Sequence, residues 1–227
     1  MARTDPIKEE HIPMRKALGS ILFTGTAAAL AIGFGASSAL ATTATTLTVK
    51  VTSGGSYSAS STKTTLTDNG VSVTCTGSKT SGTIATKTYT KKTPPVKVGT
   101  AAKLSFTGCT GPLGAVTVVV NSLPYSVNVD STTNSKGQTD GIVSGVNTAV
   151  SMTGCSFNVT GSTPGFYTNS THKLSLTPTL PIKALDTAQL TVSNVNGCAG
   201  LVNNGDHPTY KSTYTVSRAI VIKATSP

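Results

Sequence analysis

The sequence contains no Trp, and beyond Ala41 it contains no Glu. Acidic residues are therefore scarce, and five Asp supply all of them after that point: Asp68, Asp130, Asp140, Asp186 and Asp206. No two of these lie close together in sequence, whereas glycosidases need two closely placed carboxylates. A Gly-x-Ser-x-Gly nucleophile elbow is also missing. His172 and His207 lie in no triad-like pattern, so the sequence predicts a protein without enzymatic activity.

Cofactor and nucleic-acid motifs are missing as well. The four cysteines are 34, 46 and 43 residues apart, which is too wide for a zinc knuckle. The segment from Asp130 to Gly141 lacks both the turn Gly and the closing Glu of a calcium loop. No Walker-type phosphate loop occurs, and the basic residues have no aromatic platforms beside them. We therefore expect no cofactor, no bound metal and no nucleic-acid partner.

What the chain does have at its start is an export signal. Arg15 and Lys16 end a polar segment, the apolar stretch of residues 21–34 follows, and Ala39-Leu40-Ala41 has the small-x-small pattern of a cleavage site. This pattern predicts a signal peptide over residues 1–41 and a secreted protein that starts at Thr42. An uncleaved membrane anchor is the alternative, but several glycines make the stretch short and weakly apolar for a span of about 20 residues.

The composition after Ala41 favours strands. Thr and Ser make up about a third of this part, and β-branched residues prefer strands over helices. Short runs alternate apolar and polar residues, which is typical of strands with one buried face. Asp68-Asn69-Gly70 has the residues of a tight hairpin turn. We therefore expect an all-β fold, an antiparallel β-sandwich or barrel, with no amphipathic helix past Ala41. The expected strands are Leu47–Val51, Val71–Cys75, Leu104–Phe106, Ala115–Val120, Tyr125–Val129, Val146–Met152, Ser156–Thr160, Lys173–Thr177, Gln189–Val195, Thr209–Val216 and Ala219–Lys223.

The even number of cysteines in an exported chain favours disulfides. Four cysteines allow three pairings, and the sequence alone does not select one. We prefer Cys75 with Cys109 and Cys155 with Cys198, because each bond then closes the shorter loop within one half of the chain. Gly-Cys turns recur at Cys109 and Cys198, which suggests a single domain, 42–227, of two similar halves (about 42–122 and 123–227). The alternative is that Gly only eases a tight corner before each Cys.

Three segments around these cysteines resemble known sequences. LSFTGCTGPL (104–113), GCSFNVTGS (154–162) and LTVSNVNGCAGLVNNG (190–205) resemble small, uncharacterised secreted proteins of actinobacteria. The layout is also distantly similar to the PraB-like family of secreted activators of alkane oxidation, with Leu123-Pro124-Tyr125 as its Leu-Pro-aromatic motif. Tyr125 stands where that family usually has Trp. The resemblance implies no catalytic residues, and it implies an accessory factor that binds or disperses apolar molecules.

Basic residues are in clear excess. The net charge is +10, and the segment before Thr42 carries four bases and three acids, which leaves +9 on the remainder. Such a secreted protein is attracted to anionic surfaces. The densest stretch also holds two consecutive prolines, which predicts a long exposed loop or an edge strand. Its lysines are Lys87, Lys91, Lys92, Lys97 and Lys103. Alternatively, they protect a strand edge from pairing with other chains.

Two functions follow from these observations. The first is a structural or binding protein of the cell surface, held on cell-wall or other extracellular anionic polymers through the lysines, with no membrane span after signal cleavage. The second is an accessory factor with a cleft for apolar molecules. Residues expected in such a cleft are Leu123, Pro124, Tyr125, Phe157, Phe166 and Tyr167. The alternative for these side chains is ordinary core packing.

Overall fold

The computed structural model describes residues 46–182 and 188–227, so the predicted signal peptide lies outside the described residues. Strands dominate the described part, which holds no α-helix and a single turn of 3-10 helix, η1 (Cys198–Gly200). No helix in these two ranges is long and apolar enough to cross a bilayer. The strands are β1 (Leu47–Thr52), β2 (Gly55–Ser61), β3 (Thr64–Asp68), β4 (Val71–Ile84), β5 (Thr88–Lys91), β6 (Val96–Gly111), β7 (Gly114–Ala115), β8 (Thr117–Val120), β9 (Tyr125–Val129), β10 (Gln138–Met152), β11 (Cys155–Thr168), β12 (Lys173–Leu176), β13 (Leu190–Gly197), β14 (Thr209–Val216) and β15 (Val221–Thr225).

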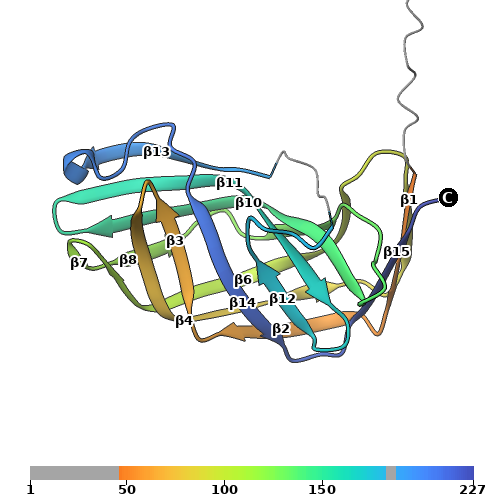
Figure 1. Cartoon of the computed structure of the whole chain (residues 1–227). Coiled ribbons are helices and arrows are strands. Elements are labelled where there is room, and N and C mark those ends of the chain that lie inside the picture. Colours follow the sequence, from red (N-terminus) through yellow and green to blue (C-terminus); the bar gives the residue numbers. More distant parts are fainter. Residues whose placement is uncertain (1–45, 183–187) are drawn as a thin grey trace, which may run out of the picture. The chain divides into compact units, whose positions relative to one another are not determined.

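Eight of these strands close into an antiparallel barrel. The pairing runs β11-β12-β14-β2-β4-β6-β9-β10, and β10 pairs again with β11 to complete the ring (Figure 1). The remaining strands of this sheet extend it, with β3 between β14 and β4, β13 on β11, β8 on β10 and β7 on β6. The prediction of an all-β antiparallel fold is confirmed, and of the two architectures expected the chain adopts the barrel.

Bulges allow the long strands to bend around this ring. In β10 the register shifts between Ser144 and Val146, at Gly145, whose φ of 80° suits glycine. Before the bulge, Val143 points inward opposite Thr163; after it, Val146 points inward opposite Gly161. The bulge therefore moves the inward face from odd to even positions, so one strand lines the interior along its whole length.

A separate three-stranded sheet, β15-β1-β5, closes one end of the barrel. The inward side chains of β1 are fully buried, and they share one apolar cluster with barrel residues such as Val98 and Val129. Asn169 ties β15 to the barrel, since its amide donates to the Ile222 carbonyl (2.8 Å) and its oxygen accepts from the Ile222 N–H (2.9 Å). Figure 1 shows β1 and β15 at the right-hand end, crossing the direction of the barrel strands.

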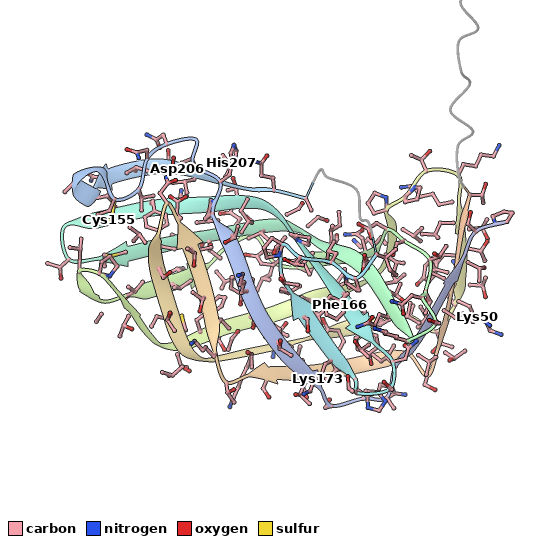
Figure 2. All side chains as sticks on the ribbon, viewed as in Figure 1. Lys50, Cys155, Phe166, Lys173, Asp206 and His207 are labelled. Carbon is pink, nitrogen blue, oxygen red and sulfur yellow. A yellow bond between two sulfur atoms is a disulfide. The ribbon has the colours of Figure 1, made fainter. Side chains whose placement is uncertain are left out.

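The opposite end carries both disulfides, Cys75–Cys109 and Cys155–Cys198, so the preferred pairing is confirmed. Cys75 and Cys109 are direct cross-strand partners on β4 and β6. Cys155 begins β11, and Cys198 follows the end of β13, whose last residue pairs with Cys155. A second apolar cluster, which includes Val73, surrounds the four sulfurs. Figure 2 shows Cys155 at this end and Lys50 of β1 at the other.

The lysine-rich stretch differs in part from its prediction. β5, the first part of the stretch, is an edge strand of the three-stranded sheet, which is one of the two structures expected. The other part, however, is no loop: β6 is a sixteen-residue strand in the middle of the barrel, paired with β4 and β9. Pro94 and Pro95 lie just before its first residue, where a missing N–H breaks no ladder. Lys97 and Lys103 thus extend from a central strand.

Candidate ligand cavity inside the barrel

The interior of the barrel is not filled between its two apolar clusters. A cavity of about 110 Å³ lies there, lined by side chains of strands from all around the ring. Its wall is mostly aliphatic and contains short side chains, because the inward positions carry many valines and threonines and no tryptophan. Eight-stranded barrels have just enough interior for side chains or for one small ligand. With short side chains, this barrel retains a small apolar space.

Aromatic rings form one side of the cavity. Phe106 of β6 and Tyr210 of β14 meet edge to face, with 6.5 Å between their ring centroids and 84° between their planes. The hydroxyl of Tyr210 lies 2.9 Å from that of Tyr214, which is 2.8 Å from the hydroxyl of Ser78. Burial and the neighbouring Tyr214 raise the pKa of Tyr210 well above its usual value, so the Tyr210 hydroxyl stays neutral. The three hydroxyls hydrogen-bond one another along the wall.

Tyr125, expected in an apolar cleft, does line the cavity. Its ring is 1% exposed, and its hydroxyl both donates to the Asn147 carbonyl and accepts from the Asn147 N–H (3.1 Å). These bonds satisfy backbone groups next to the Gly145 bulge, beyond the last residue pair of β9 and β10. Burial raises the pKa of Tyr125, which keeps the hydroxyl available as a donor. The polar end of the ring is thus occupied, and its apolar part faces the cavity.

The other expected cleft residues lie elsewhere. Phe157 is buried in the disulfide cluster, and Leu123 and Pro124 precede β9 outside the cavity lining. Phe166 and Tyr167 border a smaller space of about 30 Å³ near the three-stranded sheet. The Tyr167 hydroxyl donates to the Ile220 carbonyl (3.0 Å), and burial raises its pKa to about 12. For Phe157 and Tyr167 the core-packing alternative describes their position.

A deeply buried hydroxyl on the cavity wall, that of Thr163, is unsatisfied. Thr163 of β11 is 4% exposed, and its Oγ1 has no hydrogen-bond partner among the described residues. Sequence patterning missed this residue, together with Val118 and Val143 of the wall. Thr occurs on both faces of these strands, so its identity alone does not reveal an inward position.

The basic residues of the described part of the chain all lie on the outside of the protein. Every lysine among residues 46–182 and 188–227 is exposed, as is Arg218, whereas no aspartate in the same ranges is. Lys87 lies over the ring of Tyr89, 5.6 Å from its centroid, and the ammonium of Lys91 donates to the Pro95 carbonyl (3.0 Å). Lys92, also exposed, follows β5. The predicted lysines therefore spread over β5, β6, the turn between them and, at Lys87, the residue before β5.

Lys103 has a neighbour that the sequence did not indicate. The β4–β6 register brings Lys79 close to it, and both border a broad surface groove of about 550 Å³. Serine hydroxyls complete this lysine-serine groove, and those of Ser58 and Ser217 are hydrogen-bonded to each other at 3.0 Å. Cations with hydroxyl groups between them form a surface that suits an anionic, hydrogen-bonding chain.

Folding brings the aspartates together in two places. Asp68 and Asp206 interact directly. Burial and the hydrogen bond with Asp206 raise the pKa of Asp68 to about 6. The pKa of Asp206 is lowered by hydrogen bonds, of which the one from the Asn203 backbone N–H has the largest effect. Asp140 is fully buried and accepts from the Ile182 N–H (2.9 Å), and burial raises its pKa to about 6, with Asp130 nearby. Neither pair borders the main cavity.

The histidines lie apart from the cavity as well. His207 follows Asp206 in the loop before β14 (Figure 2), and its Nδ1 is 3.0 Å from the Leu190 carbonyl oxygen. His172 lies in the turn between β11 and β12. Among the described residues, no cluster of three or more His, Cys, Asp or Glu is placed to hold a metal ion.

Comparison with protein-family models, curated proteins and solved structures gave no match to this chain. The cavity and the outer surface therefore carry the functional argument, and the resemblance to activators of alkane oxidation stays a prediction.

Proposed function

We propose that this protein is a secreted, non-catalytic β-barrel that binds a small apolar molecule in the cavity between its two core clusters. The observation that supports this function best is the cavity itself, about 110 Å³ of space with an apolar wall. An engineered apolar cavity of about 150 Å³ stays dry and binds benzene. A ligand of similar size, with a single ring or a short alkyl chain, is the class that fits.

The energetics favour an occupant. An unfilled apolar cavity destabilises a protein by about 24 cal/mol per Å³, which amounts to about 2.5 kcal/mol for 110 Å³. A bound apolar molecule recovers part of this free energy through dispersion contacts and removal of its own surface from water. The wall is already built without the ligand, because both ends of the barrel are held by other contacts. Binding therefore needs little reorganisation.

Two adjacent residues of β8 give a matched test. Val118 borders the cavity, whereas Val119 is 50% exposed on the outside. We expect calorimetric titration to detect benzene binding to the wild-type protein and to Val119→Phe. Val118→Phe should fill the cavity and abolish binding while circular dichroism still reports a folded β-protein. Absence of benzene binding to the wild type, or unchanged binding to Val118→Phe, would contradict the proposed function.

Export is part of this proposal. The signal pattern over residues 1–41 supports it, as do two disulfides, because such bonds form and persist in oxidising compartments outside the cytoplasm. Mass spectrometry of the protein recovered from culture medium should give a chain that starts at Thr42. Recovery of an intact chain from the cytoplasm would contradict export.

A second candidate function is retention on anionic polymers of the cell surface, and the charge distribution favours it. All the described cations face solvent while every described aspartate is buried or partly buried, so the outer surface is strongly positive. The lysine-serine groove combines two of these cations with hydroxyl groups in one surface depression. This function uses the outside of the barrel and is compatible with a ligand inside.

Retention is testable with polygalacturonate, an anionic polymer, immobilised on a resin. The wild type should bind at low salt and elute as salt rises, because screening weakens exposed charge contacts. Lys79→Gln/Lys103→Gln should elute at lower salt than Lys91→Gln/Lys92→Gln, which removes the same charge outside the groove. If the two variants elute at the same salt concentration, the groove is not the binding site for the polymer. If the wild type shows no salt-sensitive binding, the proposal of retention is wrong.

A further inference from the structure

Thr163 stands out among the residues that line the cavity. Its side chain is 4% exposed, and Oγ1 is the one buried oxygen of the lining that lacks a hydrogen-bond partner among the described residues. Several other polar groups on the wall are used within the protein: the Tyr125 hydroxyl by Asn147, the Tyr214 hydroxyl by Ser78, and the Tyr57 hydroxyl, which donates to the Thr100 carbonyl (3.3 Å). Thr163 therefore adds a buried, unused hydroxyl to a largely apolar wall.

The surroundings of Thr163 offer this hydroxyl no partner of its own. The residue directly opposite on β10 is Val143, which also lines the cavity. Valine has the same shape as threonine without the hydroxyl, and an unsatisfied buried hydroxyl is destabilising. A water molecule is held firmly in a protein interior only where it finds two to four polar partners, and here the hydroxyl stands among apolar side chains. A partner brought in by a ligand would satisfy it.

We infer that the ligand is an apolar molecule with one oxygen-bearing group, such as an alcohol, phenol or ketone, and that Thr163 Oγ1 hydrogen-bonds that group. This inference rests on the proposed function and narrows it, because an entirely apolar hydrocarbon would leave the hydroxyl unsatisfied. Ligand sites of this kind combine an apolar wall with few polar groups that fix orientation. A buried hydrogen bond also discriminates strongly against a ligand that lacks the matching group.

Phenol and benzene make a suitable pair of probes, since both have the ring size that the cavity admits and they differ by one hydroxyl. The measured quantity is the ratio of the two dissociation constants, obtained by calorimetric titration of the full secreted chain. In Thr163→Val the preference for phenol should fall by about 2- to 12-fold relative to the wild type, the range expected for loss of one hydrogen bond. Thr163→Ser, which keeps the hydroxyl, should retain the wild-type preference.

A matched control lies three residues earlier on the same strand. Thr160 is only partly buried and lies outside the cavity lining, so Thr160→Val should leave the ratio unchanged. If the wild type and Thr163→Val bind both probes with the same ratio, the role of Thr163 is wrong while the apolar cavity stands. If neither probe binds the wild-type protein, the proposed function itself fails, and the inference fails with it.

Discussion

The two ends of this barrel are held in different ways. At one end, a three-stranded sheet packs its fully buried side chains, such as Val49, against the barrel wall. At the other end, two disulfides join neighbouring strands within a smaller apolar cluster. The cavity lies between them. Both ends are thus fixed independently of the middle, which explains how a barrel with short inward side chains keeps unfilled space without collapsing onto it.

Removing the disulfides should have the largest effect on stability. Loops of 34 and 43 residues give about 4 kcal/mol for each bond in the chain-entropy model. Because domains of this size are stable by about 5–15 kcal/mol, the fourfold Cys→Ala variant should be largely unfolded near 37 °C. Urea denaturation followed by far-ultraviolet circular dichroism measures this change.

The two disulfide pairs also serve as controls for each other. Cys75→Ala/Cys109→Ala and Cys155→Ala/Cys198→Ala each remove one bond of similar loop length from the same end. Either pair should lower the unfolding free energy by roughly 2–5 kcal/mol. A fourfold variant as stable as the wild type would show that the apolar clusters alone hold both ends, and the contrast between the ends would then disappear.

Shortening a buried side chain of the three-stranded sheet should have the next largest effect on stability. Ile222 of β15 is 6% exposed in the apolar cluster of that end. Ile222→Ala should lower the unfolding free energy by about 2–5 kcal/mol, since deletion of buried methyl groups leaves a cavity. The neighbouring Val221 is 41% exposed, so Val221→Ala is the matched control and should change stability by less than about 0.5 kcal/mol. Equal effects of the two substitutions would contradict the proposed packing of this sheet.

The local sequence pattern predicted the individual strands better than it predicted that the sheet closes into a barrel. Alternation identified β1 and β14 because large apolar residues recur at every second position in them, with Ser212 of β14 as the exception. β2 was missed, since its inward positions carry only Tyr57 and Ala59 among serines. In β10 the bulge at Gly145 interrupts the alternation, so only the part after it was expected. Nothing in the local sequence indicates which strands pair, for example β10 with β9 or β14 with β2. These pairings are what close the sheet into a barrel.

The candidate site was predictable only in part for the same reason. Tyr125 was expected because it completes the Leu-Pro-aromatic motif on which the resemblance to activators of alkane oxidation depends. Lys79 was missed, since its proximity to Lys103 follows from the β4–β6 register rather than from spacing. Thr163 resembles dozens of other threonines and serines until the fold places it inside. The four cysteines, in contrast, allow only three pairings, so loop length was enough to choose among them.

A smaller effect is expected from the unsatisfied hydroxyl in the middle of the barrel. Without ligand, Thr163→Val should raise the unfolding free energy by about 1 kcal/mol, because it removes a buried donor without changing shape. The increase shifts the thermal midpoint upward by a few degrees, measurable by calorimetry. A loss of stability would indicate that the hydroxyl already has a partner in the unliganded protein.

The smallest effect concerns the Asp68–Asp206 pair, which links the β3–β4 hairpin to the loop before β14. The pKa of Asp68 is raised to about 6 by burial and by Asp206, above the usual 3.9 of an unfolded chain. The folded state therefore holds this proton more tightly, and the resulting stability is complete below about pH 4 and is lost as pH rises through about 6. Above that pH the two carboxylates repel each other.

Asp68→Asn should remove this decline, since an amide donates to Asp206 at every pH. Asp140, whose pKa burial also raises to about 6, contributes in the same window, so the informative quantity is the difference between variant and wild type. The measurement is the urea midpoint at pH 4, 5, 6 and 7, with Asp68→Asn gaining stability over the wild type toward pH 7. If the difference in urea midpoint between Asp68→Asn and the wild type stays constant across this range, Asp68 ionises normally in the folded protein. Any pH dependence of stability would then come from other groups.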